Sequence, residues 1–202
     1  MNYFVTAIDT DSGKTLVSAI LCEALQADYW KPVQAGLPRD ADVVRNLIDP
    51  ALTIHPEAYL LRTAASPHAS AKLDQLEISI NKITIPETER DLVIEGAGGC
   101  LVPLNDREFV IDIISAFDAQ VILVADLYLG SINHTLLTIE ALRHRGLSIK
   151  GIVFNGASNA ESERIILLHS KLNCILRIKR EDSVDKNTIR KYAKILNQHW
   201  ND

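Results

Sequence analysis

The sequence predicts an α/β fold: a single-domain, doubly wound and mainly parallel sheet with helices on both faces. Short apolar runs recur along the chain without polar alternation, as strands buried on both faces do. Segments with helical spacing separate these runs, and this alternation is typical of right-handed βαβ units. The chain has 202 residues, which is enough for one α/β domain with a large core, so we expect 1–202 to form one domain.

The expected elements follow one another from the N-terminus. Apolar runs predict strands at 3–5, 29–30, 91–95, 120–125, 149–154 and, more weakly, 174–178. Helices are expected at about 16–25, 108–117, 132–145, 160–171 and 183–199. The helix at 132–145 has an apolar face with a period near 3.6, formed by Leu136, Leu137, Ile139, Ala141 and Leu142. The less regular segment 50–86, with its four prolines, is expected to cover the sheet as a helix and loops.

Composition excludes several classes of protein. Hydrophobic residues make up 47% and charged residues 23%, which is ordinary for a globular chain, and the net charge of −5 argues against non-specific nucleic-acid binding. No uncharged apolar run approaches the ~18 residues that a membrane span needs, and no signal peptide is recognisable. Three widely spaced cysteines rule out a disulfide framework. We therefore expect a cytoplasmic protein with neither a nucleic-acid nor a membrane partner.

The segment 6–15 is the most informative part of the chain. It places Gly13-Lys14-Thr15 between an apolar strand and a helix, which is the layout of a phosphate-binding P-loop. Backbone N–H groups at the helix start would face the phosphates, Lys14 would add a positive charge, and the Thr15 hydroxyl could ligate Mg²⁺. The usual first glycine is replaced by Ile8, which does not readily take positive φ, so the loop must turn elsewhere.

Other polar residues follow the expected strands, where ligands bind in an open α/β sheet. Lys31 follows the second strand and would project toward the P-loop. Asp40 and Asp42 are both candidate Mg²⁺ ligands and candidate helix caps. Glu95 ends a buried strand in the place of an acidic Walker-B residue, before glycines that allow close backbone approach. Asn155 could contact an adenine edge, and ATP is favoured over GTP because no Asn-Lys-x-Asp motif is present.

Together these segments resemble dethiobiotin synthetase, through four motifs in the same order. The P-loop of that family reads Gly-Thr-Asp-Thr-x-x-Gly-Lys-Thr, and 7–15 is similar to it with Ala7 and Ile8 as departures. The family's Lys-Pro-x-x-x-Gly matches 31–36, its Glu-Gly-Ala-Gly-Gly matches 95–99, and its Leu-Gly-x-Ile-Asn-His matches 129–134. The resemblance covers the first three quarters of the chain, and the motif expected near adenine is not recognisable around 176–178.

The resemblance implies a role for each matching position. Thr10, Asp11, Ser12, Gly13, Lys14 and Thr15 would bind the ATP phosphates, with Asn155 on adenine. Mg²⁺ would be held by Thr15, Asp40 and Glu95, with Asp42 as the alternative carboxylate. Lys31, together with Lys14 and Thr15, would act in catalysis. Substrate would be bound by Lys31, Ala35 and, across the interface of a homodimer, by Gly130, Ser131 and Asn133.

The implied reaction is ATP- and Mg²⁺-dependent ring closure of 7,8-diaminononanoate with CO₂, through a carbamate and a mixed anhydride, to dethiobiotin. Two alternatives remain beside it. A ParA/MinD-like switch ATPase shares the fold and the loop type, but carries an extra Lys near the loop's start, where this chain has Thr6, Ala7 and Ile8. A nucleotide-binding homologue without synthetase activity would explain Ala7 and Ala35, but it has no need for Lys31.

Overall fold

The central sheet confirms the predicted architecture. The computed structural model describes residues 1–200. In this part of the chain, seven strands form one sheet in the order β4-β2-β6-β1-β7-β8-β9, and every recorded pairing is parallel. These strands are β1 (Asn2–Ala7), β2 (Asp28–Trp30), β4 (Ile54–His55), β6 (Leu92–Gly99), β7 (Gln120–Asp126), β8 (Ile149–Asn155) and β9 (Cys174–Ile178).

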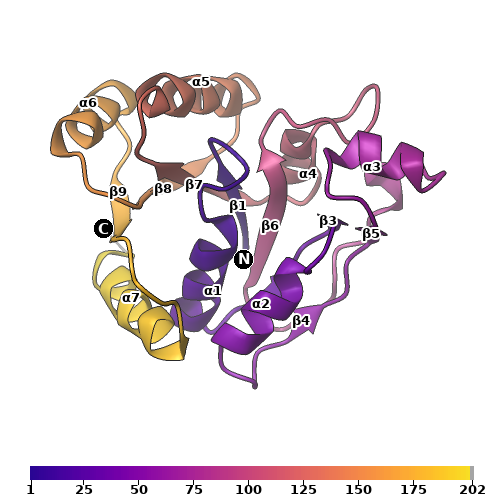
Figure 1. Ribbon diagram of the computed structural model, residues 1–202, viewed down its shortest axis with the longest axis horizontal. Helices are drawn as coiled ribbons and strands as arrows, with labels where there is room; N and C mark the ends of the chain where they lie inside the picture. The colour runs from indigo at the N-terminus through magenta and orange to yellow at the C-terminus, as the bar shows by residue number, and fades with distance from the viewer. Residues whose placement is uncertain (201–202) are drawn as a thin grey trace.

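Helices cover both faces of this sheet, as Figure 1 shows. Side chains that point to one face form a core with α1 (Lys14–Leu25), α2 (Asp40–Leu47) and α7 (Lys186–His199). Side chains that point to the other face pack against α4 (Val110–Ala116), α5 (Ser131–His144) and α6 (Ala160–Ser170). Adjacent strand residues alternate between the two cores, since Phe4 belongs to one and Val5 to the other. This two-sided burial explains the continuous apolar runs in the sequence.

The expectation for segment 50–86 was incomplete. It contains α3 (Pro67–Leu73) and a 3₁₀ turn, η1 (Ile80–Lys82), but also β4 at the edge of the main sheet. A further strand, β5 (Tyr59–Leu61), pairs in parallel with β3 (Val33–Ala35) as a separate small sheet. Strands of two or three residues are too short to show a period, and their pairing partners lie elsewhere in the chain.

β6 continues beyond the predicted end of this strand at Glu95, because its glycines fit closely against β1. Ala7 of β1 pairs with Gly99. A Cβ atom at Gly96 would lie 2.9 Å from the Phe4 ring, so only glycine allows this packing without a shift. The glycine run is therefore part of the strand, and β6 carries Glu95 in its interior.

Two expectations about helices were wrong. Neither Asp40 nor Asp42 caps α2: the N-cap is Arg39, and Asp40 and Asp42 lie inside the first turn. The Asp42 carboxylate instead accepts hydrogen bonds from the Arg39 guanidinium at 2.9 and 2.6 Å. On α5, Ile139 and Leu142 are buried as expected, but Leu137 of the predicted apolar face is 59% exposed. Across residues 1–200, no helix has the length and apolar character required to cross a membrane.

Candidate active site

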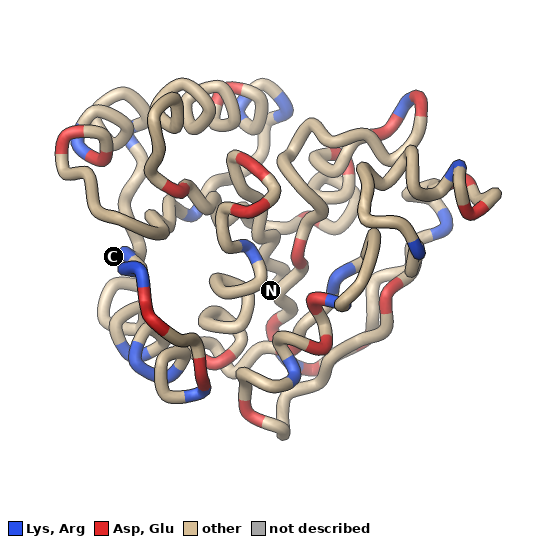
Figure 2. Tube along the Cα trace, in the orientation of Figure 1, with Lys and Arg blue, Asp and Glu red and all other residues tan. Residues whose placement is uncertain are grey.

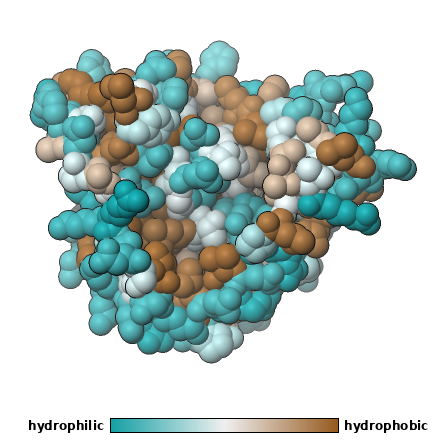
Figure 3. All heavy atoms as spheres, viewed as in Figure 1, coloured by the Kyte–Doolittle hydropathy of each residue, from teal (hydrophilic) through white to brown (hydrophobic). Residues whose placement is uncertain are grey.

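A cavity of about 610 Å³ lies where β1, β2 and β6 end. Its walls combine the P-loop, the ends of β2 and β6, the start of α2 and the segment before α3. They include nine of the residues predicted from the sequence: Thr10, Asp11, Gly13, Lys14, Thr15, Lys31, Ala35, Asp40 and Glu95. In the space-filling view, the middle of this face is hollowed and lined by pale and hydrophilic residues (Figure 3). The expected convergence of polar residues at one sheet edge is thus observed for β1, β2 and β6.

The P-loop turns at Gly13, where φ is +98°, and Ile8 does not have a positive φ, as the sequence predicted. Gly13 is the N-cap of α1. Asn155 at the end of β8 donates from Nδ2 to the Ser12 carbonyl over 2.8 Å. A Cβ atom at Gly13 would lie only 2.3 Å from Asn155 Nδ2, so glycine is required both for the turn and for this contact.

The Lys14 ammonium is held inside the loop. Its Nζ donates to the carbonyls of Asp9 and Thr10 at 3.0 and 2.8 Å. The pKa of Lys14 is lowered to about 8, mainly by burial and also by the nearby positive charge of Lys31. A bound anion would stabilise the charged form of a buried lysine that lies next to another cation. A nucleotide phosphate would supply such an anion.

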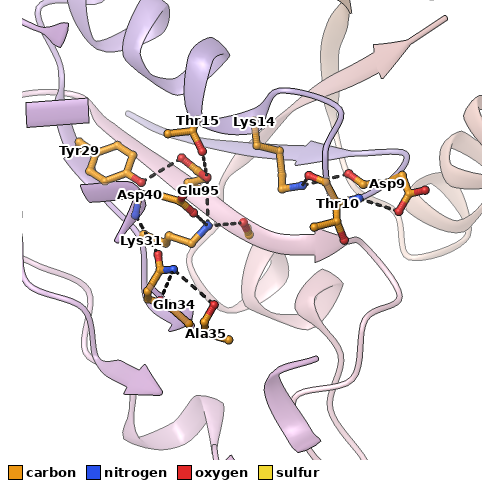
Figure 4. Close-up of polar contacts among 12 residues, drawn as sticks. Asp9, Thr10, Lys14, Thr15, Tyr29, Lys31, Gln34, Ala35, Asp40 and Glu95 are labelled. Atoms are coloured by element: carbon orange, nitrogen blue, oxygen red, sulfur yellow. Dashed lines mark hydrogen bonds and ion pairs between the residues drawn. The ribbon is translucent and has the colours of Figure 1, made fainter. Parts of the chain in front are cut away.

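Four side chains from different elements meet next to the loop (Figure 4). Glu95 is 1% exposed. Its Oε1 accepts from Thr15 Oγ1 at 2.9 Å and from Lys31 Nζ at 3.0 Å. Lys31 Nζ also lies 2.7 Å from Asp40 Oδ2. Burial opposes the charge of Lys31, but the Glu95 and Asp40 carboxylates outweigh it and raise the pKa of Lys31 above its usual value.

This arrangement fits a magnesium ion. The Lys31 ammonium lies between two carboxylates, where a metal cation could also bind, and the Thr15 hydroxyl donates a hydrogen bond to one of them. Mg²⁺ typically takes one or two carboxylates and completes its shell with phosphates and water. Residues 1–200 hold no group of three His, Cys, Asp or Glu side chains suited to a metal ion.

The geometry separates the two candidate aspartates. Asp40 lines the cavity and pairs with Lys31. Asp42 pairs with Arg39 and is not among the residues that line the cavity. Of the two carboxylates that the sequence left open, Asp40 is therefore the one that faces the cavity and Lys31.

Three contributors to the site were missed by sequence reasoning. Tyr29 donates its hydroxyl to Glu95 Oε2 at 2.9 Å. Gln34 accepts from the Asp40 N–H at 3.1 Å and donates to the Gly36 carbonyl at 3.1 Å, so it anchors the start of α2. The segment 64–67 forms one cavity wall. The only sequence signal for Gln34 was its place inside the Lys-Pro-x-x-x-Gly motif, and Tyr29 and 64–67 gave none.

The remaining predicted residues lie away from this cavity. Ser12 belongs to the loop but is buried and does not line the cavity, and its side-chain oxygen has no hydrogen-bond partner among the described residues. Asn155 lines a neighbouring cavity of about 400 Å³, together with Asp126 and 179–181. Gly130, Ser131 and Asn133 lie at the start of α5 and are not part of the wall of the main cavity. Within one chain, they are not brought together with Lys31.

The P-loop, the helix that follows it and the buried carboxylate on the neighbouring strand define a P-loop NTPase-type α/β protein. The family described as an AAA domain matches residues 1–188. Among solved structures, a ParA family ATPase from Chlorobium tepidum has a TM-score of 0.60 at 13% identity, covering 98% of this chain and 96% of that one. MinD from Pyrococcus horikoshii has a TM-score of 0.55 at 15% identity, covering 99% and 93%. At these identities the two structures show the fold alone.

Sequence relatives identify the particular family. A Cytophaga hutchinsonii protein named ATP-dependent dethiobiotin synthetase BioD is 56% identical over 201 residues, which cover 98% of both chains. Proteins of the same name from Christiangramia forsetii and Agrobacterium fabrum are 47% and 42% identical, over 96% and 100% of this chain and 94% and 95% of theirs. The chain belongs to the ATP-dependent dethiobiotin synthetase family. The likeness extends past the first three quarters that the motifs covered.

Proposed function

We propose that this protein converts 7,8-diaminononanoate, CO₂ and ATP into dethiobiotin, ADP and phosphate, as a ligase that closes a ring by forming C–N bonds. Family membership supports the overall reaction. The observation that carries the proposal is the placement of Lys31: a buried ammonium next to the P-loop, between Glu95 and Asp40. Phosphate binding alone does not need a second buried lysine, but an anionic intermediate beside ATP does.

The phosphates of ATP are assigned to the P-loop. Backbone N–H groups of 10–15, the Lys14 ammonium and the positive end of α1 favour negative charge at this point. Adenine is assigned to the neighbouring cavity, where Asn155 is bonded to the loop through Ser12. One Asn155 hydrogen is used by that bond, so its carbonyl oxygen and its second hydrogen are the groups left for the base.

Mg²⁺ is assigned to Thr15, Asp40 and Glu95. When bound, it would neutralise phosphate charge during phosphoryl transfer. In the structure, Lys31 occupies the space between these carboxylates. The same ammonium lines the cavity that would hold the substrate. Lys31 then holds the carbamate oxygens against the γ-phosphate and stabilises the charge that develops between them.

The chemical steps require positioning rather than a protein nucleophile. One substrate amine attacks CO₂, forms a C–N bond and loses a proton to give a carbamate. A carbamate oxygen attacks the γ-phosphorus, and the bond from that phosphorus to ADP breaks. The second amine then attacks the carbonyl carbon and forms the second C–N bond, its proton is released, and the ring closes as the bond from that carbon to the phosphate oxygen breaks. Lys14 and Lys31 supply positive charge along this path, and Ala35 and 64–67 form the wall on the substrate side.

We also propose a homodimer in which Gly130, Ser131 and Asn133 of one subunit bind the substrate carboxylate of the other. Their distance from the main cavity of their own chain supports this assignment. So does the apolar surface around the start of α5, because large apolar groups exposed together mark interaction sites. This surface is formed by Leu101, Tyr128, Leu129, Ile132 and Leu137.

A cytoplasmic location, one domain over 1–202 and the absence of nucleic-acid and membrane partners complete the proposal. The three free cysteines agree with a reducing compartment. Figure 2 shows positive and negative residues interspersed along the trace, with no face of one sign in this view. A nucleic-acid surface would need clustered positive charge.

The role of Lys31 can be tested with phosphate release. In the wild-type protein, release should require the diamine, bicarbonate and ATP together. Lys31→Ala should lower the rate by at least about a hundredfold, as loss of a transition-state charge partner does, while ATP still binds. Lys171→Ala, which removes a lysine at the end of α6, serves as a control for loss of a lysine as such. A Lys31→Ala rate close to that of the wild type would refute the assignment.

A further inference from the structure

Glu95 is held on both of its carboxylate oxygens, by different donors. Thr15 Oγ1 and Lys31 Nζ reach Oε1, on the side of the P-loop. The hydroxyl of Tyr29, a residue of the core, reaches Oε2 at 2.9 Å (Figure 4). Tyr29 is fully buried on β2, and its register partner on β6 is Val93, two residues before Glu95. The contact is therefore set by the pairing of β2 with β6 in the main sheet rather than by a loop.

The chemistry of the Tyr29 donor matters as much as its position. A buried carboxylate needs hydrogen bonds, and a lysine or arginine at this point would satisfy that need. Such a residue would also cancel the charge of Glu95. A phenol satisfies Oε2 without cancelling it, so the negative charge remains available to a cation on the Oε1 side. Burial and the proximity of Glu95 raise the pKa of Tyr29 well above its usual value, so the hydroxyl stays protonated at neutral pH.

We propose that Tyr29 is a positioning residue for magnesium: its hydroxyl fixes the rotation of the Glu95 carboxylate so that Oε1 faces Thr15 and the phosphates. The inference rests on the magnesium site proposed above. The terminal torsion of a glutamate is soft, with broad minima, so an unheld carboxylate would sample orientations that bind a cation poorly. Partners of this kind typically contribute 10- to 100-fold to metal affinity.

Tyr29→Phe removes the hydroxyl and keeps the buried ring. The test measures binding of a non-hydrolysable ATP analogue at a series of Mg²⁺ concentrations, and again with the metal chelated. We expect the Mg²⁺ concentration for half-maximal enhancement of binding to rise 10- to 100-fold in Tyr29→Phe. Affinity for the analogue without metal should stay within about twofold of wild type, because the P-loop is unchanged.

Tyr59→Phe is the matched control. The Tyr59 hydroxyl also makes a hydrogen bond, from the Ser79 N–H at 3.2 Å, but Tyr59 belongs to the small sheet and does not contact Glu95. Its Mg²⁺ dependence should equal that of the wild type. A second comparison uses Glu95→Gln: adding Tyr29→Phe in that background should cause no further change, because the two residues act through one contact.

Each outcome bears on a different statement. An unchanged Mg²⁺ dependence in Tyr29→Phe overturns the positioning role. Equal losses of affinity with and without metal also overturn it, because they indicate damage to the fold rather than to the metal ligand. If analogue binding by the wild type does not respond to Mg²⁺, the proposed metal site itself fails, and the role of Tyr29 fails with it.

Discussion

Two buried lysines lie in one site, and their surroundings shift their pKa values in opposite directions. Lys14 is surrounded by carbonyl oxygens, and burial lowers its pKa to about 8. Lys31 is also buried, but two carboxylates raise its pKa. Lys31 thus stays charged without a ligand, whereas Lys14 loses its proton as the pH rises above about 8 unless a bound anion stabilises its charge.

This difference predicts a pH dependence of nucleotide binding. Below pH 8 Lys14 carries its charge before ATP arrives, so affinity should be nearly constant. Above pH 8 the free protein loses that proton and binding must recover it, so affinity should fall by up to about tenfold per pH unit. The measurement is the Kd of a non-hydrolysable analogue between pH 7.5 and 9.5, where phosphate groups are already ionised.

Lys14→Arg is the control for this prediction, because a guanidinium stays charged across the whole range. Whatever its absolute affinity, the pH dependence of Lys14→Arg should be flat. An equally steep decline in Lys14→Arg would assign the effect to another group.

Some residues of the site could be predicted from the sequence and others could not. Lys14, Thr15, Lys31 and Glu95 were placed correctly beside one cavity, because each belongs to a motif at the end of a predicted strand. Tyr29 was not predicted, because its partner Glu95 is 66 positions away and the contact depends on the pairing of β2 with β6. Asp40 and Asp42 could not be separated by sequence, since only the fold shows which of them faces Lys31.

At the level of elements, the first N–H of α2 is bonded by Gln34 and not by the side chain of the N-cap residue. Gln34 is 5% exposed and bonds both the Asp40 N–H and the Gly36 carbonyl. The sequence predicted an aspartate cap because aspartates often cap helices. The side-chain amide of Gln34, which precedes the helix, performs the task here, and this leaves the Asp40 carboxylate free to face Lys31.

Gln34→Ala should therefore lower the free energy of unfolding by about 1–3 kcal/mol, since two hydrogen bonds are lost next to a buried segment. Chemical denaturation measures this value. Gln198→Ala, at an exposed position near the end of α7, should stay within about 0.5 kcal/mol of wild type. Equal effects of the two substitutions would contradict the anchoring role of Gln34.

The long strands and helices were predicted well, and so was the short β2, whereas the short strands β3, β4 and β5 were not. β1, β6, β7, β8 and β9 showed as apolar runs because both faces of the sheet are covered. β4 and β5 lie in a polar, proline-containing segment and exist through their pairing with β2 and β3. Their absence from the prediction also hid the cavity wall at 64–67, because that segment is positioned by the small sheet.

For the whole molecule, the central structural question is whether one chain forms a complete site. The start of α5 carries a family motif but lies outside the wall of the main cavity, and Leu129 beside it is fully exposed. A shared site explains both facts. Asn133→Ala and Lys31→Ala should each be inactive alone, and their mixture should recover up to about a quarter of wild-type activity per site through heterodimers with one intact site.

Recovery must follow subunit exchange, which tagged subunits can demonstrate. Mixing Lys31→Ala with Lys14→Ala is the matched control, because both residues belong to the same half of the site and no heterodimer would contain an intact one. If exchange is shown and the Asn133 mixture stays inactive, the site is not shared.

The most direct test of the proposed function is the identity of the product. The purified protein is given 7,8-diaminononanoate, ¹³C-bicarbonate, Mg²⁺ and ATP, and the product is analysed by mass spectrometry. We expect dethiobiotin carrying one ¹³C atom in its ring carbonyl, with one ADP released per molecule formed. Hydrolysis of ATP without labelled dethiobiotin, in a protein that binds the nucleotide, would contradict it.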